Sequence, residues 1–110
     1  METTVYHIVH PIWWETFVNK DYYESETLSE EKFIHLSTSE QVNGTLSNYF
    51  QGSKRLFLLH IDASKLTSNL IYEDLLDTGT MFPHLYGRLN KDAVVKVQEL
   101  LADADGVMKI

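Results

Sequence analysis

Two short strings in this sequence each place one histidine among apolar, strand-forming residues. They are FIHLST at residues 33–38, which contains His35, and FPHLYG at residues 82–87, which contains His84. A third histidine, His7, lies in an apolar run near the start of the chain. Near neutral pH an imidazole can donate or accept a proton, bind a metal ion or hold a polar ligand. If the three strands are neighbours, we expect their imidazoles to converge on one cleft.

Two hydroxyl side chains follow the first histidine string. Ser37 and Thr38 come directly after an expected strand, and Glu40 lies three residues after Ser37, as in the capping box that begins many helices. Helix N-termini bind anions through their free N–H groups, so Ser37 and Thr38 are candidates to hold a phosphate or a carboxylate. The simpler interpretation is that Ser37 only caps the helix.

A carboxylate and several aromatic side chains complete the set of candidate ligand groups. Glu73 ends an expected strand, where it can orient a sugar hydroxyl or act as a base. A surface ion pair with Arg88 is an equally good interpretation of Glu73. Trp13 and Trp14 are adjacent, so we expect one to pack in the core and the other to be free to stack on a planar ligand. Tyr86, in the second histidine string, can stack in the same way.

The spacing of the histidines is not typical of a metal centre. They include no local pair such as His-x-His, and the chain has no cysteine, so a metal-dependent enzyme is the weakest alternative and no metal ligand is predicted. The other histidines, His10 and His60, are interpreted as structural residues. The sequence has no Gly-x-Ser-x-Gly, phosphate-binding loop or Gly-x-Gly-x-x-Gly motif, so the usual signatures of serine hydrolases and nucleotide-binding folds are absent.

The size and charge of the chain exclude several classes of protein. With 110 residues, of which 44% are hydrophobic, we expect one domain over residues 1–110. The net charge of −7 argues against nucleic-acid binding. No apolar stretch approaches the roughly 20 residues of a membrane span, and residues 1–4 do not begin a signal peptide. The lack of cysteine fits a reducing cytoplasm.

The candidate side chains must be positioned by an α+β fold. The order of strand-like and helix-like segments predicts a strongly bent, mixed or antiparallel sheet with about three helices. We expect strands over residues 5–9, 33–36, 56–61, 70–73 and 85–89, an edge strand over 106–110, and helices over about 11–19, 38–50 and 91–101.

Three motifs together resemble a known family. YHIV at residues 6–9, FIHLST followed by EQV within residues 33–42, and FPHLYGRL at residues 82–89 are similar to the motifs of the bacterial domain-of-unknown-function family 952. The resemblance covers about residues 5–100. That family is similar in fold to the ADP-ribosyltransferases, which include the RNA 2′-phosphotransferases that consume NAD. The resemblance therefore implies an ADP-ribosyltransferase-like fold.

The resemblance also implies roles for particular residues. His7 occupies the place of the first-strand histidine that contacts the nicotinamide ribose in transferases of this fold. His35 or Ser37 corresponds to the polar residue near their second core strand. Glu73 is the nearest candidate for the late glutamate that orients the reacting ribose. The phosphotransferases use a set of arginines for phosphate, whereas this chain has only Arg55 and Arg88.

The combined expectation is a small cytoplasmic protein whose cleft binds a small molecule, namely NAD or an ADP-ribose-like nucleotide. If the protein is an enzyme, the resemblance implies NAD-dependent glycosyl (ADP-ribosyl) transfer, with NAD as substrate. The alternative is a non-catalytic module that binds a small metabolite or a peptide. The predicted catalytic residues are His7, His35 and Glu73, and the predicted ligand-binding residues are Trp13, Ser37, Thr38, His84, Tyr86 and Arg88.

Overall fold

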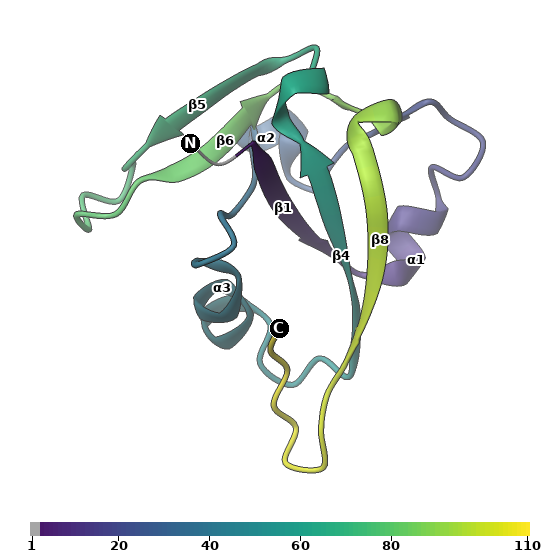
Figure 1. Ribbon diagram of the computed structural model, residues 1–110, viewed down its shortest axis with the longest axis vertical. Helices are drawn as coiled ribbons and strands as arrows, with labels where there is room; N and C mark the ends of the chain where they lie inside the picture. Colours follow the sequence, from purple (N-terminus) through teal and green to yellow (C-terminus); the bar gives the residue numbers. More distant parts are fainter. Residues whose placement is uncertain (1–2) are drawn as a thin grey trace.

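The computed structural model describes residues 3–110 as short helices arranged around antiparallel strands (Figure 1), which confirms the α+β class. In chain order the elements are β1 (Thr4–Val9), α1 (Pro11–Glu15), β2 (Tyr22–Tyr23), α2 (Leu28–Glu31), β3 (Ile34–His35), α3 (Val42–Tyr49), β4 (Arg55–Asp62), the 3-10 helix η1 (Ala63–Lys65), β5 (Asn69–Glu73), β6 (Phe82–Tyr86), β7 (Leu89–Asn90), the 3-10 helix η2 (Lys91–Ala93) and β8 (Val94–Leu101).

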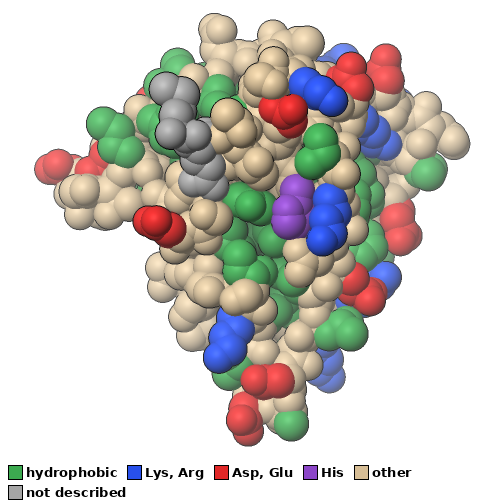
Figure 2. Space-filling model, viewed as in Figure 1, with side chains coloured by type: hydrophobic (Ala, Val, Ile, Leu, Met, Phe, Trp, Pro, Cys, Tyr) green, Lys and Arg blue, Asp and Glu red, His purple; other side chains and the backbone are tan. Residues whose placement is uncertain are grey.

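The centre of the molecule is an antiparallel sheet with the strand order β1–β4–β8. β4 lies in the middle, and its apolar run is buried because successive side chains pack on opposite faces of the sheet. One face packs on α3, and the other packs on residues of β2 and β3. Figure 2 shows hydrophobic side chains near the middle of the α3 side and charged side chains around its rim. The fully buried residues of β4 are Leu56, Leu58, Leu59 and Ile61.

Two smaller antiparallel sheets complete the fold. One has the strand order β3–β6–β5, and the other pairs β2 with β7. Figure 1 shows β5 and β6 as a ribbon that extends to one side of β1. A bridge between Tyr6 of β1 and Ser37, just after β3, connects this ribbon to the central sheet. Every strand pair in residues 3–110 is antiparallel, and the strands form three sheets instead of the one strongly bent sheet that the sequence predicted.

The predicted helix over residues 91–101 is wrong. After the short η2, the chain forms strand β8, which pairs with β4 from Arg55↔Leu101 to Ile61↔Val94. Apolar residues in this segment fit a helical spacing, but its valines are β-branched and favour an extended backbone. β4 has two edges, of which β1 covers one, and β8 satisfies the backbone groups of the other. Pairing with β4, which is distant in the sequence, therefore determined that residues 94–101 form a strand.

The helix that follows the first histidine string begins later than predicted. Ser37 does not cap it, because its N–H donates to the carbonyl of Tyr6 at 2.8 Å and its carbonyl accepts from the N–H of Tyr6 at 2.8 Å. The chain then turns, and α3 starts at Val42. The N–H of Thr38 donates to the side chain of Gln41 at 3.0 Å. Ser37 therefore forms a backbone bridge between two sheets and does not act as the N-cap of a capping box.

The remaining differences lie at the ends of elements. The helix predicted over residues 11–19 ends at Glu15. Residues 106–110 form no strand, although Ile110 is held by hydrogen bonds with the side chain of Asn43. The helical turn α2 lies in residues 20–32, which we call the acidic segment because five of its residues are Asp21, Glu24, Glu26, Glu30 and Glu31.

Gly87, between β6 and β7, is a position where the backbone requires glycine. Its φ is 144°, and an added Cβ would lie 2.5 Å from the Oγ of Ser68. We expect Gly87→Ala to lower the free energy of unfolding by about 1–3 kcal/mol, measured by urea denaturation, because the substitution adds backbone strain and steric overlap. Gly44→Ala is the control: Gly44 lies in α3 with no atom within 4 Å of an added Cβ, and its replacement should stabilise by up to about 1 kcal/mol. Equal effects at both positions would contradict this account.

Candidate functional site

His7 lies inside the protein and links three strands. Its Nδ1–H donates to the backbone carbonyl of His35 at 2.7 Å, and its Nε2 accepts from the hydroxyl of Tyr23 at 2.8 Å. The carbonyl can only accept, so Nδ1 must carry the proton, and a neutral ring leaves Nε2 free to accept. His7 on β1 therefore holds β3 through a backbone atom and β2 through a side chain.

Burial keeps the His7 imidazole neutral. Removal from water lowers its pKa from 6.5 to about 4, and the hydrogen bond to the carbonyl of His35 opposes this change only in part. Burial also raises the pKa of the Tyr23 hydroxyl, and the negative charge of Glu26 adds to that effect. At neutral pH the pair thus consists of an uncharged imidazole and an uncharged phenol, which is compatible with a buried position.

The other two candidate histidines meet on one face of the β3–β6–β5 sheet. His35 and His84 are directly paired across β3 and β6, so their side chains emerge on the same face, with ring centroids 5.3 Å apart. The ring of Phe33 stacks on His84 at 4.2 Å and contacts His35 edge to face at 4.7 Å. His84 is buried, with 5% of its surface exposed, whereas the side chain of His35 is 57% exposed.

Glu73 accepts hydrogen bonds from two predicted ligand-binding residues. Its Oε2 accepts from Nδ1–H of His84 at 2.9 Å and from the hydroxyl of Tyr86. The bond from Tyr86, followed by that from His84, holds the pKa of Glu73 below its ordinary value. The same bond from the phenol to the carboxylate raises the pKa of Tyr86. At neutral pH the group is therefore an ionised carboxylate with a protonated phenol beside it.

A second carboxylate holds the exposed histidine. Glu31, at the end of α2, lies 3.0 Å from Nε2 of His35, and the hydroxyl of Thr27 also donates to Glu31. The pKa of Glu31 is lowered first by the bond from Thr27 and then by the bond from His35. Each of the two adjacent imidazoles is thus paired with a carboxylate. We call the side chains of His35, Glu73, His84 and Tyr86 the two-histidine face.

The predicted anion-binding residues Ser37 and Thr38 have structural partners. The buried Oγ of Ser37 lies 3.1 Å from Oγ1 of Thr45 in α3, and the backbone of Ser37 pairs with β1. The backbone N–H of Thr38 donates a hydrogen bond to the side-chain oxygen of Gln41. In this conformation both residues connect β3 to α3.

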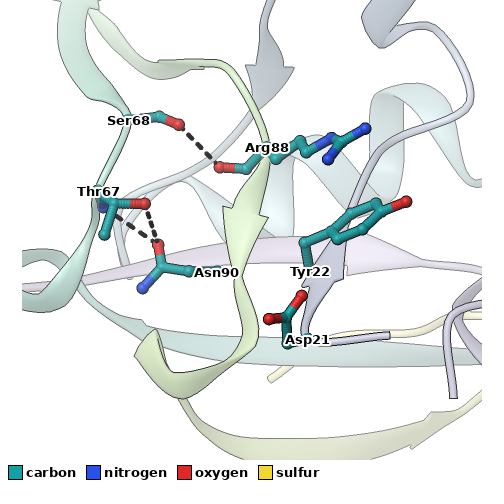
Figure 3. A pocket seen from close by; sticks show the side chains of 6 residues that line it. All are labelled: Asp21, Tyr22, Thr67, Ser68, Arg88 and Asn90. Atoms are coloured by element: carbon teal, nitrogen blue, oxygen red, sulfur yellow. Dashed lines mark hydrogen bonds between the residues drawn. The ribbon is translucent and has the colours of Figure 1, made fainter. Parts of the chain in front are cut away.

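Arg88 lies at a hollow of about 400 Å³ beside the pairing of β2 with β7 (Figure 3). Its guanidinium is 4.0 Å from the ring centroid of Tyr22, and its Nε donates to Glu24 at 2.9 Å. The sequence suggested Glu73 as a partner, but Glu24 takes that role. The hollow is lined by Asp21, Tyr22, Thr67, Ser68, Arg88 and Asn90.

Trp13 lies at a different hollow, of about 260 Å³, between α1 and the acidic segment. Its Nε1–H donates to the backbone carbonyl of Glu24 at 2.8 Å. Trp14 packs beside Tyr23, with ring centroids 5.4 Å apart, and beside Lys91. The expected difference between the two indoles is therefore small: both are partly buried and pack against the core, and Trp13 also lines a pocket.

The structure thus brings four of the predicted site residues together on the two-histidine face. His7 contacts this group only through the backbone of His35, and Trp13 and Arg88 line other hollows. Sequence reasoning missed Phe33 and Glu31. Phe33 lies two residues before His35, the spacing that shares one face of a strand, and Glu31 lies four residues before it, so both signals were present in the sequence.

The described residues give no metal centre and no membrane-spanning helix. Within residues 3–110, no three His, Asp or Glu side chains are grouped so that they could hold a metal ion. In the same residues, no helix combines the length and the apolar composition that crossing a bilayer requires.

Comparisons with known proteins give a family and a fold. The family model described as "Protein of unknown function (DUF952)" matches residues 8–97. No curated protein matches the sequence. A crystal structure of protein CC0527 from Caulobacter crescentus is 34% identical, with a TM-score of 0.86, and the match covers 97% of this chain and 94% of that one. The solution NMR structure of CC0527 is also 34% identical, with a TM-score of 0.81 and coverage of 96% and 91%.

The family match contains the second and third motifs singled out in the sequence and the last two residues of the first, and the structural match covers 97% of the chain. The chain belongs to the family described as "Protein of unknown function (DUF952)".

Proposed function

We propose that this protein binds NAD or an ADP-ribose-like nucleotide, with the ribose placed against the two-histidine face. The observation that carries the proposal is the ionised Glu73, which accepts hydrogen bonds from both His84 and Tyr86. The resemblance of the motifs to proteins similar in fold to the ADP-ribosyltransferases supports the same ligand class. We infer an ADP-ribosyltransferase-like fold on that ground, and a cytoplasmic location from the lack of cysteine.

The chemistry of Glu73 suits a ribose. Both of its hydrogen bonds end on Oε2, and Oε1 accepts none from residues 3–110, so Oε1 can accept a ribose hydroxyl. When the bond between C1′ and the nicotinamide nitrogen breaks, its electron pair leaves with neutral nicotinamide and positive charge develops on the ribose. A carboxylate that stays ionised stabilises that charge. Water or an acceptor hydroxyl then forms the new bond to C1′ and loses a proton.

The two histidines have different roles in this proposal. The exposed His35, held by Glu31, contacts the ribose or the diphosphate and can take the proton from the acceptor. The buried His84 orients Glu73 and forms the wall of the site. His7 acts through the position of His35, because its hydrogen bond fixes the backbone at that residue.

Titration with NAD, ADP-ribose and nicotinamide tests the binding step. A ligand at about ten times its Kd raises the free energy of unfolding by about 1.4 kcal/mol, which appears as a higher melting temperature. We expect NAD and ADP-ribose to stabilise the protein and Glu73→Gln to weaken that effect. Glu99→Gln is the matched control, because Glu99 also has a side-chain partner, Arg55, but lies on β8. No stabilisation by either nucleotide would refute the proposal.

Release of nicotinamide from NAD distinguishes an enzyme from a binding module. If the protein is a transferase or hydrolase, Glu73→Gln should lower the rate by about 10²-fold or more, and His35→Ala should abolish release. Binding without release would favour the alternative, a non-catalytic module for a small metabolite. One observation favours that alternative: both ring nitrogens of His7 have partners inside the protein, so neither is free for a ligand.

A further inference from the structure

We propose that the hollow beside Trp13 is a binding site for a small organic cation, such as a quaternary or alkyl ammonium group. This site is independent of the two-histidine face. We call it the Trp13 pocket; it is lined by Trp13, Phe17, Glu24, Ser25, Glu26, Leu28 and Ser29.

The aromatic wall of this pocket is held in place. The indole N–H of Trp13 donates to the carbonyl of Glu24 at 2.8 Å, and the indole packs edge to face on Phe17 with ring centroids 5.5 Å apart. The fixed indole does not need to be ordered when a ligand binds, which lowers the entropic cost of binding. An indole face is also the best of the natural aromatic surfaces for attracting a cation.

The acidic segment contributes two carboxylate side chains to the lining of this pocket. Glu24 and Glu26 both line the pocket. Arg88 neutralises Glu24 through a 2.9 Å bond, and Lys32 donates to the carbonyl of Ser29 at the pocket rim. Glu26 is exposed and has no hydrogen-bonded or ion-paired partner in residues 3–110, so its charge can pair with a ligand.

A hydroxyl without a partner gives a second, independent reason to expect a ligand here. The Oγ of Ser25 is buried and makes no hydrogen bond within residues 3–110. Buried polar atoms in native proteins nearly always have partners, because leaving one unsatisfied costs about 1–3 kcal/mol. A cation with a hydroxyl or N–H group could supply that partner. The pocket volume of about 260 Å³ also suits a small ligand rather than a macromolecule.

Choline and its uncharged isostere, 3,3-dimethylbutan-1-ol, test the inference directly. In a Trp14→Phe background, Trp13 is the single tryptophan, so its fluorescence reports on the pocket. At constant ionic strength we expect choline to change the emission in a saturable way, with a Kd of about 1–10 mM, and the isostere to bind at least about tenfold more weakly. Equal binding of the two compounds, or no saturable change up to about 50 mM choline, would overturn the proposal.

Two variants show whether choline binding depends on a carboxylate that lines the pocket or only on the net negative charge of the acidic segment. Glu26→Gln should weaken choline binding about threefold or more, because it removes a lining carboxylate. Glu30→Gln removes an exposed carboxylate of α2 that does not line the pocket, and the affinity of this variant for choline should be unchanged. Equal losses in both variants would refute a specific site. Glu73→Gln should leave choline binding unchanged, so this test and the nucleotide test fail independently.

Discussion

Acidification from pH 7 to pH 4 is expected to remove about 3 kcal/mol of stability through His7 alone. Burial lowers the pKa of His7 in the folded protein to about 4, whereas an unfolded chain has the ordinary value of 6.5. Between pH 6.5 and pH 4 the His7 imidazole is protonated in the unfolded chain but stays neutral in the folded protein. Stability is therefore complete above about pH 6.5 and is lost as the pH falls toward 4. Urea denaturation at several pH values measures the loss.

His7→Gln is the control for this pH dependence, because glutamine does not titrate. The variant should be less stable than the natural sequence at pH 7, since it disturbs the bonds to Tyr23 and to the carbonyl of His35. Toward pH 4 the difference should shrink. Parallel pH profiles for the two proteins would contradict the role of His7. If the variant does not fold, NMR titration of the natural sequence provides the test. The signals of the His7 ring should stay unchanged until well below pH 6.

Leu59→Ala is expected to lower the free energy of unfolding by about 3 kcal/mol. Leu59 has no exposed surface and lies on the middle strand β4, paired with His7 on one side and Val97 on the other. Its side chain belongs to the core cluster between the central sheet and β3, so its truncation leaves a cavity that neighbouring strands cannot fill without shifting. Urea denaturation should show a lower midpoint with an unchanged slope.

Leu76→Ala provides the matched comparison for the core substitution. Leu76 lies in the loop between β5 and β6 and is 76% exposed, so removing the same atoms should change stability by less than about 0.5 kcal/mol. If the two variants lost similar stability, the packing of β4 described above would be incorrect.

Part of the candidate site was predictable because it depends on local alternation. Residues two apart on a strand share a face, so the sequence places His84 with Tyr86, and Phe33 with His35. The link from Glu73 to His84 was not predictable in this way. It depends on the register of β5 against β6, where Glu73 is opposite Phe82 and Ile71 is opposite His84. That register is set by a long loop and by core packing, which no local pattern encodes.

The sequence by itself determined the α+β class, the buried strand β4 and the motifs of the family, because these depend on composition, apolar runs and short-range spacing. Only the tertiary structure decided that residues 94–101 form a strand, that Ser37 joins two sheets instead of capping a helix, and that His7 is buried beside Tyr23. In each case a partner far away in the chain supplied hydrogen bonds or removed water. Such contacts outweigh local preferences because unsatisfied backbone groups and buried charges cost more than a change of conformation.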